Sequence, residues 1–184
     1  MTPPRYILSI DPGIKGALCL MDSSAVPVEF FDMPAKDGKV DGARLAAIVE
    51  MCLVQVGSGG LHAAVENVSS RPGQAHSFAF GTGFGKVLGI LEAAGVPYSL
   101  VSASQWKPAM GLGRAVNESQ SDTKSRARQL ASKLLPKCAD KFEKVKNADR
   151  AEAYLIGRFY LFKNIEAAKA ARLLAEDIYW GSNR

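Results

Sequence analysis

The pattern of apolar positions in the first third of the chain predicts three strands followed by a helix. Residues 5–10, 15–21 and 26–31 are short runs rich in β-forming residues, and an Asp-Pro-Gly turn signal follows the first run. Their short connections favour an antiparallel meander. Over residues 42–56 the apolar positions recur every three or four residues, which is typical of a helix with one buried face, and Asp41 is a suitable N-cap.

Strands and helices alternate through the rest of the chain, which predicts an α/β fold with one mixed sheet covered by helices on both faces. The remaining strands are expected at residues 61–65, ending at Glu66, and at 98–101. The remaining helices are expected at residues 76–94, at 104–110, from Asp122 or Thr123 to 135, from Asn147 or Asp149 to 163, and from 164 to a point before Trp180. Residues 111–121 show no periodicity and are expected to form a mobile loop.

Length and composition restrict the classes of protein. A chain of 184 residues corresponds to one domain, and we expect it to span residues 1–163, with residues 164–184 as a C-terminal helical extension. A hydrophobic fraction of 47% and a charged fraction of 22% are typical of a globular protein rather than a disordered one. No apolar run approaches a membrane span, so we expect no membrane association. Three scattered cysteines and the lack of a signal peptide favour a reducing cytoplasm.

Positive charge is concentrated in the second half of the chain. Residues 1–100 contain 7 Lys and Arg against 9 Asp and Glu, whereas residues 101–184 contain 16 against 9. Such an asymmetry is typical of a protein that binds a polyanion such as nucleic acid on one surface. A basic helix surface that only faces solvent would give the same counts, so charge alone leaves both readings open.

Four acidic residues lie where a sheet and a helix would present them together. Asp11 and Glu66 each follow an apolar strand, while Asp149 and Glu152 are three residues apart at the start of a helix and therefore share one face. Each has an ordinary explanation alone, as a turn residue, a salt-bridge partner or a helix N-terminal acid. Packed together, carboxylates need a partner, and Mg²⁺ prefers carboxylate oxygens.

Small residues recur every fourth position in the glycine-rich helix, at Gly81, Gly85, Gly89 and Ala93. The stretch is not a phosphate loop, because the required first glycine and the final Ser or Thr are missing. On a helix these residues form a groove that another element can approach closely. Both the protein's own sheet and the same helix of a second copy remain candidates for that element.

Several segments of the chain, in order over residues 5–160, resemble the RuvC-type Holliday junction resolvases, and among them the phage-encoded members most. These enzymes belong to the ribonuclease H-like nucleases. The matching segments are Ile10-Asp11-Pro12-Gly13, Val65-Glu66-Asn67, the small-residue helix Gly81–Ala94, Gln105-Trp106-Lys107, Thr123-Lys124-Ser125, and Lys146-Asn147-Ala148-Asp149-Arg150-Ala151-Glu152-Ala153.

The resemblance implies a ribonuclease H-like five-stranded mixed sheet, with an antiparallel meander followed by parallel strands. It implies that Asp11, Glu66, Asp149 and Glu152 hold two Mg²⁺ ions, for which Mn²⁺ would substitute. One ion would activate a water and the other would stabilise the leaving 3′ oxygen. The activity implied is paired, symmetric nicking of four-way (Holliday) junctions by a homodimer, with other branched DNA as further substrates, in the cytoplasm of a bacterium or a phage-infected host.

The resemblance also assigns roles to basic and aromatic residues. Lys107 and Lys124 match family lysines near the scissile phosphate, where compact cations balance phosphate charge. Arg71, Phe78 and Arg126 are expected to contact DNA, although a core position for Phe78 is equally consistent with the sequence.

Two positions depart from the family pattern. The last acid is usually Asp but is Glu152 here, and Ser69 stands where the cellular enzyme has an aromatic residue that stacks on a base.

Two other functions use the same fold. A non-catalytic DNA-binding module would keep the fold and lose the acids, and all four acids are present. An ATP-binding kinase or chaperone-like domain also uses an Asp-Pro-Gly turn, but such proteins duplicate the fold and need a second domain. The sequence therefore favours the junction nuclease over both.

Overall fold

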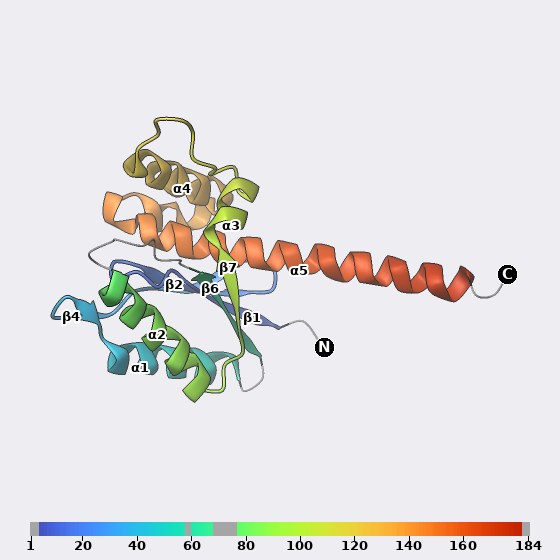
Figure 1. Ribbon diagram of the computed structural model, residues 1–184, viewed down its shortest axis with the longest axis horizontal. Coiled ribbons are helices and arrows are strands. Elements are labelled where there is room, and N and C mark those ends of the chain that lie inside the picture. Colours follow the sequence, from blue (N-terminus) through green and yellow to red (C-terminus); the bar gives the residue numbers. More distant parts are fainter. Residues whose placement is uncertain (1–3, 58–59, 68–76, 182–184) are drawn as a thin grey trace.

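A five-stranded mixed sheet forms the centre of the computed structural model, which describes residues 4–57, 60–67 and 77–181, with side chains up to Ala167. The strand order is β3-β2-β1-β6-β7 (Figure 1). Pairs β1–β2 and β2–β3 are antiparallel, whereas β1–β6 and β6–β7 are parallel. The meander and the mixed sheet expected from the sequence are thus confirmed. The strands are β1 (Tyr6–Ile10), β2 (Ala17–Asp22), β3 (Pro27–Asp32), β6 (Leu61–Asn67) and β7 (Tyr98–Ser102).

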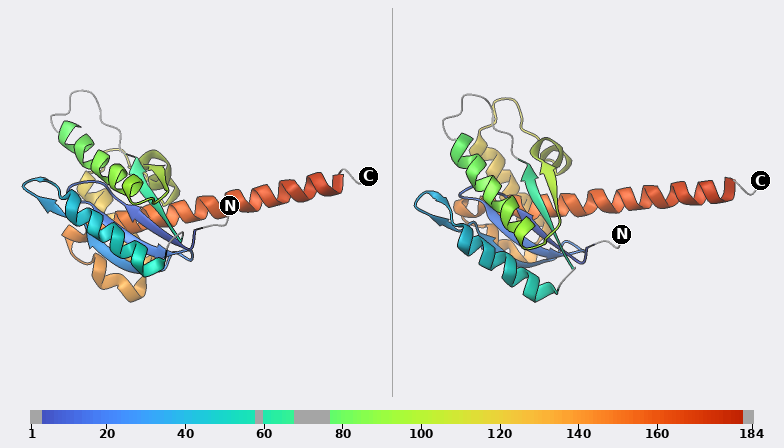
Figure 2. Two further views of the ribbon diagram at one scale, coloured as in Figure 1. Left: turned by 90° about the horizontal axis from the view of Figure 1, so that it is seen from below. Right: turned by 60° about the horizontal axis from the view of Figure 1, so that its bottom comes forward.

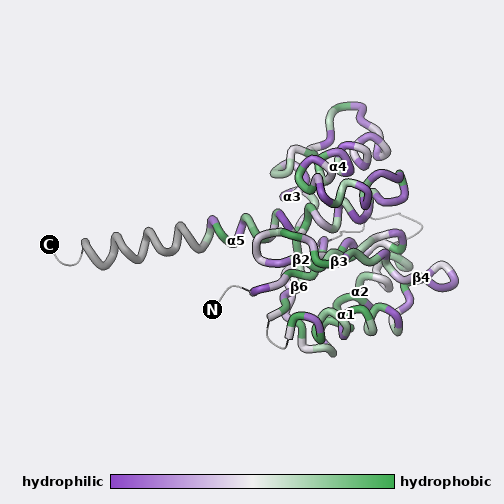
Figure 3. Tube along the Cα trace, turned by 180° about the vertical axis from the view of Figure 1, so that it is seen from behind, coloured by the Kyte–Doolittle hydropathy of each residue, from purple (hydrophilic) through white to green (hydrophobic). Residues whose placement is uncertain are grey.

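The central strands are buried on both faces, so they read as continuous apolar runs rather than as alternating ones. Alternate residues of each strand still belong to two separate cores. In β1, Ile7 lies in one core, and Leu8 and Ile10 lie in the other. Figure 3 shows the apolar residues concentrated in the sheet and in helix α1 (Gly42–Val56), and hydrophilic ones frequent along helix α4 (Gln120–Leu134).

Helices cover both faces of the sheet, as Figures 1 and 2 show. Helix α1 buries Leu45, Val49 and Cys52 against the sheet, which is the face that the sequence pattern predicted, and its N-cap Asp41 accepts a hydrogen bond from the Arg44 backbone N–H at 3.2 Å. Helices α1 (Gly42–Val56) and α2 (Ser77–Ala93) lie on one face, and α3 (Ala103–Ala109), α4 (Gln120–Leu134) and α5 (Ala148–Gly181) lie on the other.

Four short elements were not predicted from the sequence. Strands β4 (Ala35–Lys36) and β5 (Lys39–Val40) form a hairpin. Asp37 and Gly38 form its turn with φ of 50° and 71°, so an Asp-Gly hairpin signal was present in the sequence. The 3-10 turns η1 (Pro136–Phe142) and η2 (Val145–Asn147) connect α4 to α5.

Helix α4 starts earlier than the sequence reading placed it. Its N-cap is Ser119, whose hydroxyl accepts from the Asp122 backbone N–H at 3.1 Å, while the Asp122 carboxylate accepts from the Ser119 backbone N–H at 3.3 Å. This reciprocal capping box makes Asp122 the third helical residue rather than the cap. The expectation that Asp122 or Thr123 caps the helix was wrong.

Helix α5 is one continuous helix of 34 residues, not two helices divided near residue 163. Residues 158–180 contain neither proline nor glycine, so nothing in them breaks the helix. Figure 1 shows its C-terminal part extending away from the body of the molecule. The division into a domain of residues 1–163 and an extension of 164–184 remains a prediction.

Helix α5 packs closely on the middle of the sheet at Gly157. A Cβ atom at this position would lie 2.5 Å from the Met21 Cε atom and 2.7 Å from the Ser9 Oγ atom, so only glycine permits this approach. The contact fixes the height of α5 over β1 and β2, and therefore the position of the acids in its first turns.

In the part of the chain that the structure describes, no helix is both long and apolar enough to cross a membrane.

Candidate metal centre

Asp11 and Glu66 reach the same edge of the sheet because β1 and β6 are parallel neighbours. Ile10 pairs with Val65 in the register of the two strands, so the residues that follow them are adjacent. Alternation along the strands places Asp11 on the face of Ile7, and Glu66 on the face of Ala64, and both of those residues belong to the core under α5. Both carboxylates are therefore presented on the side of the sheet that α5 covers.

The turn after β1 holds Asp11 in place. The Gly13 backbone N–H donates to Asp11 Oδ1 at 3.1 Å. A Cβ atom at Gly16 would lie 2.1 Å from the Asp11 carbonyl oxygen, so the turn closes tightly only because this position is glycine. The Asp-Pro-Gly signal in the sequence thus corresponds to a tight turn that fixes the position of the Asp11 carboxylate.

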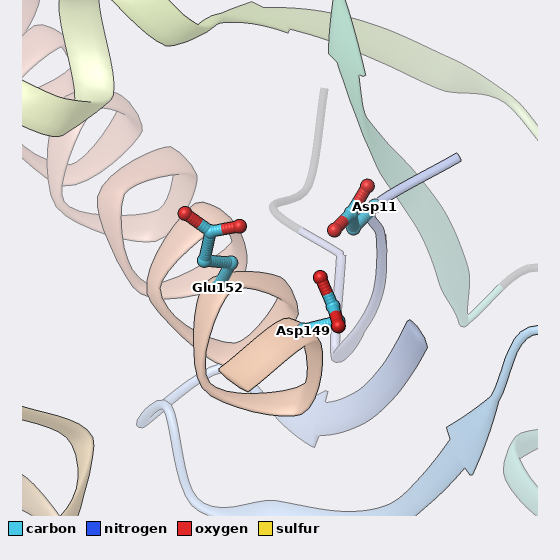
Figure 4. A group of neighbouring side chains, drawn as sticks. All are labelled: Asp11, Asp149 and Glu152. Carbon is cyan, nitrogen blue, oxygen red and sulfur yellow. The ribbon is translucent and has the colours of Figure 1, made fainter. Parts of the chain in front are cut away.

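Helix α5 brings two further acids to that edge. Carboxylate oxygens of Asp11, Asp149 and Glu152 lie within 4.8 Å of one another, and Figure 4 shows the three side chains turned toward a common space. The Asp11 and Glu152 residues are only 9% and 7% exposed. Glu66 is not part of this group of three.

Asp149, Glu152 and Glu66 each accept a hydrogen bond from another side chain. Lys124 Nζ donates to Asp149 Oδ1 at 2.5 Å, and Lys107 Nζ donates to Glu152 Oε1 at 3.1 Å. The Trp106 indole N–H donates to Glu66 Oε1 at 2.9 Å. The structure therefore brings both sequence-predicted lysines to the acids. It also adds Trp106, which lies in a segment that resembles the family and was given no role there.

Burial and mutual repulsion make negative charge costly at this edge. Burial, followed by the charges of Glu66 and Glu152, raises the pKa of Asp11 to about 7. Burial also raises the pKa of Glu66, although the Trp106 N–H and the charge of Lys107 oppose it. Burial disfavours the charged form of Lys124, but its hydrogen bond to Asp149 and the surrounding acids outweigh this, so its pKa is raised. A bound cation would relieve the repulsion.

The donor set suits a hard divalent cation. Carboxylate oxygens are the ligands that Mg²⁺ and Mn²⁺ prefer, and three elements distant in the sequence contribute them here. Asp11, Asp149 and Glu152 are close enough to share one ion, and Glu66 lies close enough to Asp11 to raise its pKa. The individual roles of these residues as ligands remain predictions.

The residues expected to contact DNA lie in different surroundings. The Phe78 side chain is 88% exposed on α2, so the alternative that it is a core residue was wrong. Arg126 is bonded to Glu118 through Nη1, at 2.8 Å and 2.9 Å to its two carboxylate oxygens. Arg71 and Ser69 lie outside the described residues.

The small-residue stripe of α2 does not pack on the protein's own sheet. Cβ atoms built at Gly81, Gly85 and Gly89 would meet nothing within 4 Å in the described structure. Only Gly83 faces inward, where a Cβ atom would lie 3.2 Å from Val40 Cγ2. Of the two alternatives left open by the sequence, packing on the sheet was therefore wrong for this stripe.

The mixed five-stranded sheet flanked by helices is a ribonuclease H-like fold of the RuvC type. Two solved structures of Thermus thermophilus RuvC share this fold. One is RuvC in complex with a Holliday junction substrate, with 19% sequence identity, 84% of this chain and 94% of that chain covered, and a TM-score of 0.56. The other is a further RuvC structure, with 19% identity, 86% and 96% coverage, and a TM-score of 0.54. No family model and no curated protein matches the chain.

Proposed function

We propose that this protein is a metal-dependent endonuclease that resolves four-way DNA junctions, and other branched DNA, by paired symmetric nicks. The observation that carries the proposal is the group of Asp11, Asp149 and Glu152 at the sheet edge of a RuvC-type fold. The T. thermophilus protein of that fold was solved with a Holliday junction substrate. The basic second half of the chain, which includes α3 and α4, is consistent with a DNA partner.

In this proposal the four acids hold two Mg²⁺ ions, with Mn²⁺ as a substitute. Bound divalent ions supply an activated water and charge stabilisation for the leaving oxygen in phosphodiester hydrolysis. The residues of the chain position the ions and supply positive charge beside the phosphate. Asp11 and Glu66 are fixed by the sheet, Asp149 and Glu152 by α5, and Lys107 and Lys124 place positive charge where a phosphate would approach the acids.

Phe78 and Arg71 complete the proposed DNA surface. Phe78 is an exposed aromatic ring at the start of α2, and Arg71 belongs to the segment that connects β6 to α2. An exposed ring can stack on an unpaired base, and a guanidinium can bind phosphate, which are the contacts that the centre of a branched junction requires. DNA recombination and repair in the cytoplasm would provide such substrates, and the three free cysteines are compatible with that compartment.

Paired nicking needs two active sites, so we propose that the protein acts as a homodimer. The exposed stripe of Gly81, Gly85 and Gly89 on α2 would let the same helix of a second copy approach closely. Gly85→Leu should then convert a dimer into a monomer, whereas Glu50→Leu on α1 should leave the dimer intact. A monomer mass for the wild type, by light scattering at micromolar concentration, would contradict this interface.

The direct test of the function is cleavage of a labelled synthetic four-way junction, with a linear duplex of the same sequence as control, each with Mg²⁺ and with EDTA. We expect nicks at symmetric positions in the junction with Mg²⁺ only, and no cleavage of the duplex. Junction binding without cleavage under any metal condition would instead show a non-catalytic DNA-binding module.

A further inference from the structure

A groove of about 550 Å³ leads away from the candidate metal centre between α3 and α4. At one end it is lined by Glu152, Lys107 and Lys124, which belong to the acid and lysine pairs already described. At its other side it is lined by Gly113 and Arg114, from the loop that joins α3 to α4. The groove is therefore continuous with the candidate metal centre and extends beyond it.

The lining of the groove has the chemistry of a phosphate-binding surface. It contains three cationic side chains and one carboxylate, and that carboxylate is already paired with Lys107. Ser104, Gln120 and Thr123 add neutral polar groups along its walls. Cations with interspersed hydrogen-bonding groups bind a polyanionic backbone.

The loop wall of the groove is held by one arginine. Arg126 Nη1 donates to both carboxylate oxygens of Glu118, at 2.8 Å and 2.9 Å, and Arg126 also donates to the carbonyl oxygens of Gly111 and Gly113. Glu118 in turn accepts from the Ala115 backbone N–H at 2.9 Å, and its side chain is only 9% exposed. The Arg126 guanidinium is thus directed into the loop rather than toward the groove.

Arg114 is presented to the groove by this arrangement. Its Nε donates to the Glu118 carbonyl oxygen at 2.9 Å, which fixes the base of the guanidinium. In the described part of the chain, no hydrogen bond or ion pair involves its two Nη groups, and Arg114 is exposed. A guanidinium that is held at Nε and has both Nη groups available can bind a phosphate through two hydrogen bonds.

We propose, resting on the nuclease function proposed above, that this groove binds the backbone of the DNA strand that enters the metal centre. Arg114 contacts a phosphate next to the scissile one, and Arg126 is a positioning residue that acts through Glu118 to hold the loop. The sequence reading expected Arg126 itself to contact DNA. The two assignments predict opposite effects of Glu118→Gln, which frees Arg126 and makes the protein one charge more positive. DNA binding should weaken if Arg126 only holds the loop, and should tighten if Arg126 contacts DNA.

The experiment is fluorescence anisotropy of a labelled four-way junction in EDTA, where binding occurs without cleavage, over a series of salt concentrations. Arg114→Gln should weaken binding roughly tenfold, the equivalent of about 1.4 kcal/mol. It should also lower the slope of log K against log salt by about 0.9, the value for one phosphate contact. The matched control is Arg44→Gln on α1, where the side chain is 79% exposed and, among the described residues, forms an ion pair with neighbouring Asp41 alone. It should change neither quantity.

Glu118→Gln should weaken binding to a similar extent as Arg114→Gln, despite its added positive charge. The Arg114→Gln/Glu118→Gln double variant should be no weaker than Arg114→Gln alone, because both changes remove the same contact. Arg114→Lys, which keeps the charge at an exposed position, should restore part of the affinity and the salt slope.

Two results would overturn this assignment while leaving the nuclease proposal intact. The first is Arg114→Gln behaving like the Arg44→Gln control in affinity and slope. The second is tighter binding by Glu118→Gln, which would make Arg126 the direct DNA contact. Failure of the wild type to bind the junction at all would instead overturn the proposed function, and the groove assignment with it.

Discussion

The acids of the sheet and the acids of helix α5 are held in different ways. Asp11 and Glu66 come from strands, and neutral groups donate to them, the Gly13 backbone N–H and the Trp106 indole N–H. Asp149 and Glu152 come from a helix, and a lysine ammonium group is bonded to each. The helix therefore brings its negative charge together with directly bonded positive charge, whereas the hydrogen bonds to the two sheet acids come from neutral groups.

We expect the two sheet acids, Asp11 and Glu66, to depend most on a bound cation. The pKa values of Asp11 and Glu66 are both raised, with burial as the first cause. A bound divalent cation would stabilise the charged forms of both carboxylates. Substitutions in the strand pair should accordingly affect metal-dependent activity more than substitutions in the helix pair.

The largest effect is expected from neutralising a strand acid. Asp11→Asn and Glu66→Gln should each lower the rate of junction cleavage by on the order of 10³-fold or more, because each removes a charged ligand of a preorganised site. Junction binding should be retained, since affinity comes mainly from Lys and Arg contacts to phosphate. Asp140→Asn, at a side chain 64% exposed, is the control in the same gel assay. Near wild-type nicking by either strand variant would remove that residue from the site.

A smaller loss is expected at Glu152 in the helix pair. Its side chain is one methylene longer than the usual Asp, and Mg²⁺ tolerates little distortion of its octahedral shell. We expect Glu152→Asp to keep activity with Mn²⁺ and lose some with Mg²⁺, and Glu152→Gln to be impaired by about 10²-fold with both. Single-turnover rates with each metal measure this.

The alternative for Glu152 is that it only stabilises the start of α5, a contribution of about 0.3–1 kcal/mol. Glu152→Gln would then reduce stability slightly and leave the cleavage rate of the folded protein unchanged. That outcome would leave a site of three acids.

Trp106→Phe should weaken the metal site without unfolding the protein. The substitution removes the N–H that holds Glu66 and keeps most of a buried ring. Losing a partner that orients a metal ligand typically costs about 10- to 100-fold in metal affinity or activity. The readouts are the Mg²⁺ concentration for half-maximal cleavage and Mn²⁺ binding by electron paramagnetic resonance.

The control for Trp106 is Phe142→Leu, which disturbs the same core cluster without touching an acid. It should lower the melting temperature and leave the metal requirement unchanged. Equal metal requirements in the two variants would reduce Trp106 to a packing role.

A stability effect of pH should expose the strand acids directly. An acid whose pKa is higher in the folded protein binds more protons folded than unfolded between the two pKa values. Stability therefore falls as pH rises through that window, here from about 4 to about 7. In EDTA we expect unfolding free energy to decrease by on the order of 2 kcal/mol from pH 5 to pH 8, since a pKa difference of one corresponds to ~1.4 kcal/mol.

Urea denaturation at each pH measures this decrease. Asp11→Asn should flatten the profile, and Mg²⁺ should raise stability at pH 8 because it binds the folded state. Stability that increases with pH across this window would contradict the account of the strand acids.

The sheet and the acids could be predicted from the sequence because they depend on local patterns. The three-strand meander, the helix of residues 42–56 with its Asp41 cap, and the approach of Asp11, Asp149 and Glu152 follow from periodicity, turn residues and strand ends. The predicted end of the helix at residue 163 was wrong, because no residue in that region breaks a helix and α5 continues through it.

The contacts between distant residues could not be predicted in the same way. Trp106 and Glu66 are 40 positions apart, and only the packing of α3 against β7 and α5 brings the indole N–H to the carboxylate. Arg126 is a second such case. Its position on a basic helix predicts a DNA contact, which remains a prediction, and gives no sign of the bond to Glu118 that the fold shows. The Ser-x-x-Asp capping box at the start of α4 was a local signal that could have been used.

The central claim is that carboxylates from the sheet and from α5 hold divalent ions together. Anomalous diffraction from crystals grown with Mn²⁺ tests it most directly, with Asp11→Asn crystals as the comparison. The account predicts two manganese peaks in the wild type, at coordination distance of about 2.0–2.3 Å from the carboxylates of Asp11, Asp149, Glu152 and Glu66, and weaker or missing peaks in the variant. Manganese bound only elsewhere on the protein, or no peak at these four acids, would contradict it.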